Sequence, residues 1–296
     1  MRRREFLGTT TGTLAGAIAS LSGDACLQAR PPASGQEAAI ERGEGFTKAA
    51  DFWKEPFKRL VIMGESTVEG GPWLARREDC FADVLAGLIN ACQKQPVEYH
   101  NKGIGANAIS PRSPGYAQSR KPSALERYKA DVIDLKPDLF VLCYGLNDMR
   151  AGMRVEEFRQ DLATIIRDVK QACAPLTVLT TVYYMTGWRS FPPYDKGSVR
   201  MTLAYNACLR GLAAEFGCVV ADLWGAEGGA DWLIHYDGVH ANKVGNLVLA
   251  HRVFEAIAQQ ASGLAQWSFT QERDSEWTRL TTRRRAEAGD PFQKTW

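Results

Sequence analysis

The chain has 296 residues, of which 45% are hydrophobic and 24% are charged, a balance typical of a soluble globular protein with one large or two small domains. Its 36 basic and 34 acidic residues leave a formal net charge of +2, and because this nearly neutral chain has no basic stripe, no nucleic-acid partner is expected. No apolar run reaches the roughly 18 residues that a transmembrane helix needs, so no integral membrane span is expected.

The N-terminus, residues 1–30, resembles a twin-arginine export signal. Arginines at 2–4 precede a weakly apolar stretch at 9–21 that is rich in Thr, Gly and Ala. We therefore expect export to the periplasm or out of the cell, with cleavage within residues 25–33. A basic tail without a targeting role is the alternative. Residues 31–50 follow as a linker rich in Pro and Gly.

The seven cysteines include no CxxC pair, which argues against a zinc site or a thioredoxin-like site. Cys80 and Cys92 flank a predicted helix, which would hold them too far apart for a disulfide. A disulfide among Cys173, Cys208 and Cys218 is left open by the sequence.

Short apolar strands alternate with helices from residue 51 to 262. The predicted strands, in chain order, are 59–64, 97–101, 138–144, 177–183 and 218–223, and the predicted helices are 79–93, 123–135, 155–172, 198–216 and 241–260. This alternation predicts an α/β fold, a single three-layer α/β/α domain with a doubly wound parallel sheet of five strands. Residues 263–296 form a polar tail without a strand signal, and we expect the tail either to pack across the surface or to be mobile.

Polar residues follow the first two predicted strands. Ser66 lies directly after the first strand, in the segment Gly64–Thr67, where it is well placed as an exposed nucleophile, although a helix cap or a turn residue is the alternative. The segment is not the GxSxG elbow of α/β-hydrolases, because Val68 occupies the second Gly position. The second strand ends in the glycine-containing segment Asn101–Asn107, which can expose backbone N–H groups to an anion or only form a tight turn.

Two further motifs lie near later strands and the last helix. Asn147 follows the third strand, where its amide can point into the same crevice or form an Asx turn. Asp237 precedes His240 by three residues, a spacing that lets the carboxylate accept a hydrogen bond from Nδ1 and leaves Nε2 as a base. A DxxH pair is common by chance, and two ligands alone make a poor metal site. The remaining histidines are interpreted as structural: His100, His235 and His251.

The order of these motifs resembles the SGNH (GDSL-type) hydrolase family over residues 57–260. The matching blocks are GEST after the first strand, NKGIGAN after the second, GLND after the third and DGVH before the last helix. The resemblance implies a flavodoxin-like SGNH hydrolase fold over residues 51–262. It also implies a serine enzyme that hydrolyses carboxylic esters through an acyl-enzyme and needs no metal or organic cofactor.

Specific roles are implied by the same resemblance. Ser66 would be the nucleophile, His240 the base and Asp237 the group that orients the base. The oxyanion hole would consist of the backbone N–H of Ser66, a backbone N–H in the turn Gly105–Ala106, and the side chain of Asn147.

Two positions depart from the family pattern. Glu65 stands where the family usually has Asp, so a longer acid must fit the same turn. Ala106 stands at the position of the usual oxyanion Gly. Because the donor is a backbone group, Ala is chemically adequate provided that its φ is negative.

The sequence says less about the substrate. Residues 184–200 form a long loop after the fourth strand that contains Trp188, Phe191 and Tyr194. These aromatic rings can stack on a sugar, line an acyl pocket or only pack the loop onto the domain. We expect a small-molecule or carbohydrate ester as substrate, with short-chain or O-acetyl esters foremost. A lipase or lysophospholipase, or a non-catalytic carbohydrate-binding protein on the same scaffold, is the alternative.

Overall fold

A computed structural model describes residues 49–287 of the chain. The predicted export signal, most of the predicted linker and the last residues of the tail lie outside this range. None of the helices within residues 49–287 is both long enough and apolar enough to cross a membrane.

Five parallel strands form one sheet in the order β2-β1-β3-β4-β5. Their bounds are β1 (Arg59–Gly64), β2 (Glu98–Gly103), β3 (Leu139–Cys143), β4 (Leu176–Thr180) and β5 (Val219–Ala221). Every residue of β3 and β4 is buried, which follows from their near-continuous apolar sequences. The predicted five-stranded parallel sheet is therefore confirmed.

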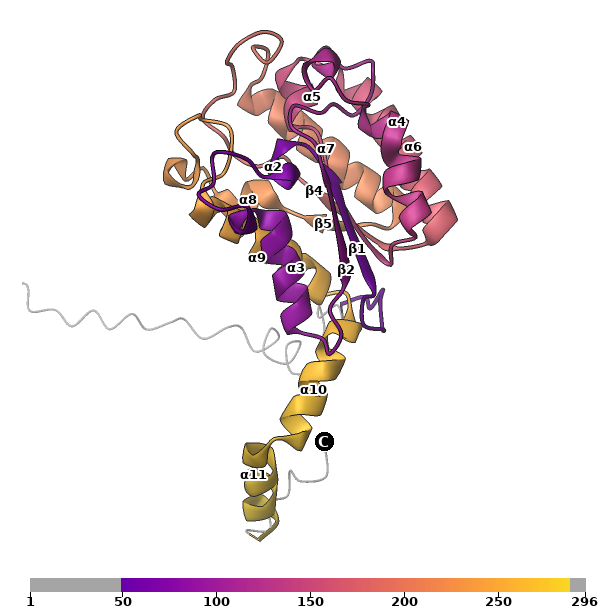
Figure 1. The fold of residues 1–296 in the computed structure, drawn as a ribbon, viewed down its shortest axis with the longest axis vertical. Helices are drawn as coiled ribbons and strands as arrows, with labels where there is room; N and C mark the ends of the chain where they lie inside the picture. Colours follow the sequence, from indigo (N-terminus) through magenta and orange to yellow (C-terminus); the bar gives the residue numbers. More distant parts are fainter. Residues whose placement is uncertain (1–48, 288–296) are drawn as a thin grey trace, which may run out of the picture. The chain divides into compact units, whose positions relative to one another are not determined.

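Helices cover both faces of the sheet (Figure 1). One face carries α3 (Phe81–Ala91), α8 (Leu223–Glu227) and α9 (Lys243–Ala258), and the other carries α4 (Ala124–Asp131), α6 (Val155–Cys173) and α7 (Val199–Phe216). Apolar side chains of these helices and of the sheet form one buried cluster. The arrangement is the predicted three-layer α/β/α architecture.

The strand order reverses next to β1. The chain passes from β1 to its neighbour β2, then crosses back to β3 on the other side of β1 and continues to β4 and β5. In open parallel sheets of this order, ligands bind outside the carboxyl ends of the strands at the reversal. Two short helices begin at this point, α2 (Ser66–Glu69) directly after β1 and α5 (Leu146–Arg150) after β3.

Most of the described part of the C-terminal segment is helical, and the sequence analysis predicts no helix there. It contains α10 (Ala265–Asp274) and α11 (Glu276–Glu287). Hydrogen bonds join the start of this segment to the first described residues, with Gly263 N–H donating to the Trp53 carbonyl at 3.1 Å. Both helices are polar on average and only weakly amphipathic, so their sequences lack the apolar periodicity on which the prediction relied.

All six cysteines within the described range are free. The disulfide that the sequence left open among Cys173, Cys208 and Cys218 is therefore not formed. Cys80 and Cys92 flank α3 as predicted, at its N-cap and C-cap positions.

Candidate active site

Ser66 lies at the carboxyl end of β1 because the chain turns sharply there. Gly64 closes the strand, and a Cβ at this position would lie 2.4 Å from Cγ2 of Val68 and 2.6 Å from the Cys143 carbonyl oxygen. Only glycine fits so close an approach of β1, β3 and α2. Glu65 is the N-cap of α2, so Ser66 is the first residue of that helix, and Ser66 as a whole is 7% exposed.

The three residues of the expected triad form one chain of hydrogen bonds. His240 Nε2 lies 2.9 Å from Ser66 Oγ, and His240 Nδ1 lies 2.7 Å from Asp237 Oδ2. The other carboxylate oxygen of Asp237 accepts the backbone N–H groups of Val239 and His240 at 2.8 and 2.9 Å. The turn between the two residues is possible because Gly238 has a φ of 76°. The DxxH spacing thus places the carboxylate against Nδ1, as the sequence predicts.

The environment keeps Asp237 charged and favours neutral His240. Burial alone would raise the pKa of Asp237, but hydrogen bonds from the backbone and imidazole of His240 outweigh it and lower that pKa to about 2. Burial lowers the pKa of His240 below its ordinary value of 6.5, and Asp237 opposes part of that shift. At neutral pH the imidazole can therefore accept a proton at Nε2.

Three N–H donors are available at the end of the sheet that carries Ser66. The backbone N–H groups of Ser66 and Ala106 make no hydrogen bond among the described residues. Asn147 is the second residue of α5, and its Nδ2 donates to the Asn107 carbonyl at 3.1 Å, which leaves its second hydrogen free. These donors come from the carboxyl ends of β1, β2 and β3, the positions that the sequence predicts for an oxyanion hole.

The backbone at Ala106 differs from the expectation. Its φ is 55°, so the condition of a negative φ is not met. The residue is the third of a turn that closes with Asn107 N–H donating to the Ile104 carbonyl at 3.2 Å, and a positive φ at that position favours Gly. The left-handed conformation costs Ala about 1 kcal/mol. Tyr194, from the long loop, donates its hydroxyl to the Ala106 carbonyl at 3.2 Å.

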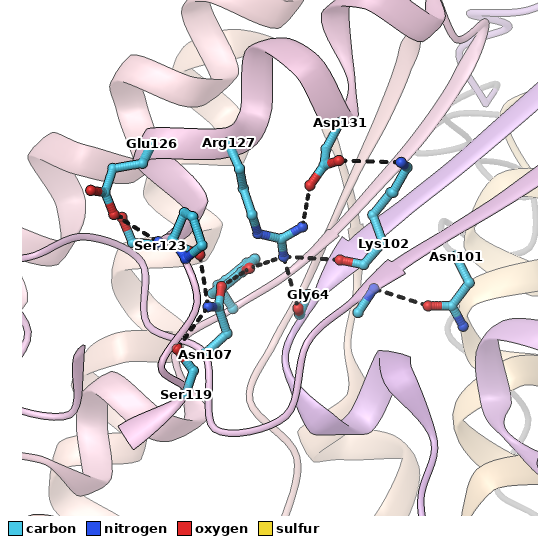
Figure 2. A network of polar contacts seen from close by, with 12 residues as sticks. Gly64, Asn101, Lys102, Asn107, Ser119, Ser123, Glu126, Arg127 and Asp131 are labelled. Atoms are coloured by element: carbon cyan, nitrogen blue, oxygen red, sulfur yellow. Dashed lines mark hydrogen bonds and ion pairs between the residues drawn. The ribbon is translucent and has the colours of Figure 1, made fainter. Parts of the chain in front are cut away.

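A buried arginine on α4 joins the ends of three strands (Figure 2). Arg127 Nη2 donates to the Lys102 carbonyl at 2.9 Å, to the Tyr144 hydroxyl at 2.7 Å and, at 3.4 Å, to the Gly64 carbonyl. Its Nη1 pairs with Asp131 at 2.5 Å. One guanidinium therefore fixes the ends of β1 and β2 and the residue that follows β3.

Asn107 fixes the turn after β2 from the other side. It is fully buried, and its Oδ1 accepts the Tyr144 hydroxyl at 2.7 Å (Figure 2 shows its position). Its Nδ2 donates to the Pro122 carbonyl at 3.0 Å. Because its carbonyl also accepts from Asn147, the turn that carries Ala106 and the side chain of Asn147 are held as one unit.

Glu65 fits the position where the family pattern has Asp. The residue is 2% exposed, and its two carboxylate oxygens accept the backbone N–H groups of Gly145 at 2.8 Å and Asn147 at 3.0 Å. Burial raises the pKa of Glu65 well above its ordinary value, and the neighbouring charge of Asp148 adds to this effect. The longer acid thus bridges the residue before Ser66 to the start of α5.

The three aromatic residues proposed from the long loop have different surroundings. Phe191 is 62% exposed, whereas Tyr194 is 4% exposed and lies beneath the guanidinium of Arg150 at 5.3 Å. Trp188 is half-buried and packs against the rings of Tyr184 and Trp224 at 5.9 and 6.1 Å. Only Phe191 of the three therefore presents most of its ring to solvent.

Two residues that contact the triad cannot be identified as site residues from the sequence. The indole of Trp73 stacks on the imidazole of His240, with ring centroids 3.6 Å apart and planes 5° from parallel. His235, interpreted from the sequence as structural, has its Nδ1 3.2 Å from Asp237 Oδ2. Trp73 lies in an irregular loop, and His235 lies outside the matching sequence blocks. Neither residue therefore belongs to a sequence pattern that predicts a role in the site. Within residues 49–287, no group of three or more His, Cys, Asp or Glu side chains is arranged to hold a metal ion.

Comparisons with known proteins agree with this geometry. The model of the GDSL-like lipase/acylhydrolase family matches residues 62–248. No curated protein matches the sequence significantly. Solved structures with a similar fold include a lipase/acylhydrolase from Enterococcus faecalis, at 22% identity and a TM-score of 0.53, covering 68% of this chain and 95% of that chain. They also include an acetyl xylan esterase variant from Geobacillus stearothermophilus, at 19% identity and a TM-score of 0.53, covering 71% of this chain and 98% of that chain.

The family match includes more than half of the chain and all four motifs of the site. It begins within β1 and ends within α9, so it spans Ser66, Asn147, Asp237 and His240. The chain belongs to the GDSL-like lipase/acylhydrolase family and is an ester-hydrolysing enzyme.

Proposed function

We propose that this enzyme hydrolyses short-chain carboxylic esters through an acyl-enzyme on Ser66, with O-acetyl esters of carbohydrates as its main substrates. The observation that carries the proposal is the unbroken series of hydrogen bonds from Ser66 Oγ through His240 to Asp237. It lies at the sheet end that also presents the free N–H groups of Ser66 and Ala106.

Acylation begins when Ser66 Oγ attacks the ester carbonyl carbon and His240 Nε2 takes the hydroxyl proton. Negative charge develops on the carbonyl oxygen, and the N–H groups of Ser66, Ala106 and Asn147 stabilise it. Asp237 holds the imidazole in the tautomer with a proton on Nδ1 and stabilises the imidazolium that forms. The tetrahedral intermediate then collapses, and the alcohol leaves with the proton from Nε2.

Deacylation repeats the steps with water. His240 Nε2 takes a proton from a water molecule as its oxygen attacks the acyl carbon, and the same donors stabilise the second tetrahedral intermediate. Collapse of that intermediate breaks the bond to Ser66 Oγ, which regains its proton from His240. The acid product leaves, and the enzyme returns to its starting state.

A carbohydrate substrate is supported by exposed aromatic rings close in sequence to the triad. Tyr236, directly before Asp237, is 95% exposed, and Trp232 is 78% exposed. Phe191 of the long loop is also mostly exposed. Aromatic rings with an open face suit the apolar faces of sugar rings. One of the similar solved structures is described as an acetyl xylan esterase, which agrees with this substrate class.

We also propose that the enzyme acts outside the cytoplasm. The support is the arginine-rich N-terminus followed by a weakly apolar stretch, residues 2–4 and 9–21. Acetylated polysaccharides are too large to enter a cell intact, so an enzyme that hydrolyses them must itself be exported to reach them.

A panel of esters tests the substrate class. The purified enzyme is assayed on p-nitrophenyl esters of increasing acyl length and on acetylated xylose and xylo-oligosaccharides, with Ser66→Ala as the control. We expect kcat/KM to be highest for acetyl and to fall with chain length, and acetate to be released from the sugars. Highest activity on long acyl chains would identify a lipase-type acylhydrolase instead. Sugar binding without hydrolysis of any ester would identify a non-catalytic binding protein.

A further inference from the structure

The imidazole of His240 is held at its two ring nitrogens by hydrogen bonds to Asp237 and Ser66, and a tryptophan packs against one of its faces. Trp73 lies parallel to it, with ring centroids 3.6 Å apart and planes within 5°. The two rings come from distant parts of the chain, since Trp73 belongs to the loop between α2 and α3 and His240 precedes α9. The stack therefore joins the loop after the nucleophile to the loop of the base.

The absence of a side chain at Gly71 leaves the space that the indole of Trp73 occupies. A Cβ at Gly71 would lie 2.4 Å from two atoms of the six-membered ring of Trp73, so the ring packs directly against the backbone there. Leu74 N–H donates to the Gly71 carbonyl at 3.0 Å and closes the turn that places Trp73. The indole thus contacts both the backbone at Gly71 and the imidazole of His240.

The hydrogen bonds of the triad leave this face of the imidazole without support. The bonds to Asp237 and Ser66 lie at the two ring nitrogens, and neither restricts tilting of the ring about the line between them. The loop of the base is also partly open to water, because the side chain of Asp237 is 32% exposed. A flat ring at van der Waals distance prevents the tilt and keeps water from that face.

We infer that Trp73 is a positioning residue that holds the plane of His240 so that Nε2 stays in line with Ser66 Oγ. This inference rests on the proposed role of His240 as the base. Its π face also favours the imidazolium that forms as the proton is transferred. A group that acts in this way affects the chemical step and not the binding of the ester.

Three variants test whether the aromatic face of Trp73 against His240 supports catalysis. Trp73→Leu removes the aromatic face, Trp73→Phe keeps one, and Gly71→Ala displaces the indole without changing it. Trp267→Leu is the matched control, because Trp267 is a half-buried indole on α10 that contacts Lys94. The measurements are kcat and KM on p-nitrophenyl acetate, with the downfield NMR resonance of the Nδ1 proton shared by His240 and Asp237.

We expect Trp73→Leu and Gly71→Ala to lower kcat by about 10- to 100-fold, the scale of a displaced catalytic group, with KM within about three-fold of the wild-type value. The Nδ1 proton should exchange faster with water in both variants. Trp73→Phe should retain most of the activity and the resonance, and Trp267→Leu should match the wild type.

Unchanged kcat and an unchanged resonance in Trp73→Leu would overturn the inference. A rise in KM alone would also overturn it, because the indole would then contact the substrate and not support the base. His240→Ala separates this inference from the proposed function. If that variant is inactive while Trp73→Leu is fully active, the inference fails and the function stands. If His240→Ala keeps wild-type activity, the proposed function itself fails.

Discussion

At the scale of single residues, the donors near Ser66 differ in what a substitution removes. Asn147 contributes a side-chain N–H that is positioned by its bond to the Asn107 carbonyl, whereas Ala106 contributes its backbone. Asn147→Ala should therefore lower kcat by about 100- to 1,000-fold, the usual effect of losing one oxyanion donor. Ala106→Gly keeps the N–H and adopts a φ of 55° without strain, so its kcat should stay within a few-fold of the wild-type value.

Steady-state kinetics on one activated ester compare these two variants, and circular dichroism confirms that each is folded. KM should change little in either, because the donors act on the charge of the transition state. Wild-type kcat in folded Asn147→Ala would mean that other groups stabilise the oxyanion.

The pH dependence tests the base and its partner. His240 must be neutral to accept the Ser66 proton, and its burial lowers its pKa, so the acid limb of kcat/KM should have its midpoint below 6.5. Asp237 raises the pKa of His240, so Asp237→Asn should move the midpoint to lower pH and also reduce the maximal rate. The measurement is kcat/KM between pH 4 and 9 for both proteins. A midpoint that moves to higher pH in Asp237→Asn would contradict this account of the pair.

At the scale of elements, the site depends on contacts between the ends of neighbouring strands. Glu65, after β1, accepts N–H groups of Gly145 and Asn147 at the start of α5. Glu65→Gln keeps the shape but replaces one acceptor oxygen with an NH2 group that faces an N–H donor. We expect a loss of about 1–3 kcal/mol in the free energy of unfolding, the cost of a buried polar group left without a partner.

The same variant should also affect catalysis, because Asn147 lies on the element that Glu65 holds. Denaturant unfolding measures the stability, and kcat on p-nitrophenyl acetate measures the activity. Glu65→Asp is the comparison, since it restores the acid that the family usually has. If Glu65→Gln is as stable and as active as the wild type, the bridge between β1 and α5 has no role.

The sequence predicts elements well where burial controls the pattern. β1 and β3 have near-continuous apolar runs, and the predicted bounds of β1 are the observed ones. The DxxH pair is predictable because both partners lie in one turn. Tertiary contacts are not predictable in this way. The hydrogen bond of buried Tyr194 to the Ala106 carbonyl and the stack of Trp73 on His240 both join residues about 90 or more positions apart. The sequence does not indicate α10 and α11, because these polar helices lack a clear apolar face.

At the scale of the whole molecule, the catalytic domain and the N-terminal segment should be separable in function. Replacing Arg3 and Arg4 by Lys should keep the precursor in the cytoplasm, because twin-arginine transport recognises the paired arginines. Cell fractionation with an antibody to the enzyme measures the distribution, and the activity of purified protein should not change. Normal export of the double variant would show that residues 1–30 use another route or carry no export signal.

The central claim for the whole molecule is that Ser66 forms the acyl-enzyme. The most direct measurement is the intact mass and peptide map of the enzyme after reaction with an organophosphonate, alongside hydrolysis of p-nitrophenyl acetate by Ser66→Ala. The account predicts one adduct, located on Ser66, and a folded Ser66→Ala protein with kcat reduced by about 1,000-fold or more. An adduct on another residue, or wild-type hydrolysis by Ser66→Ala, would contradict it.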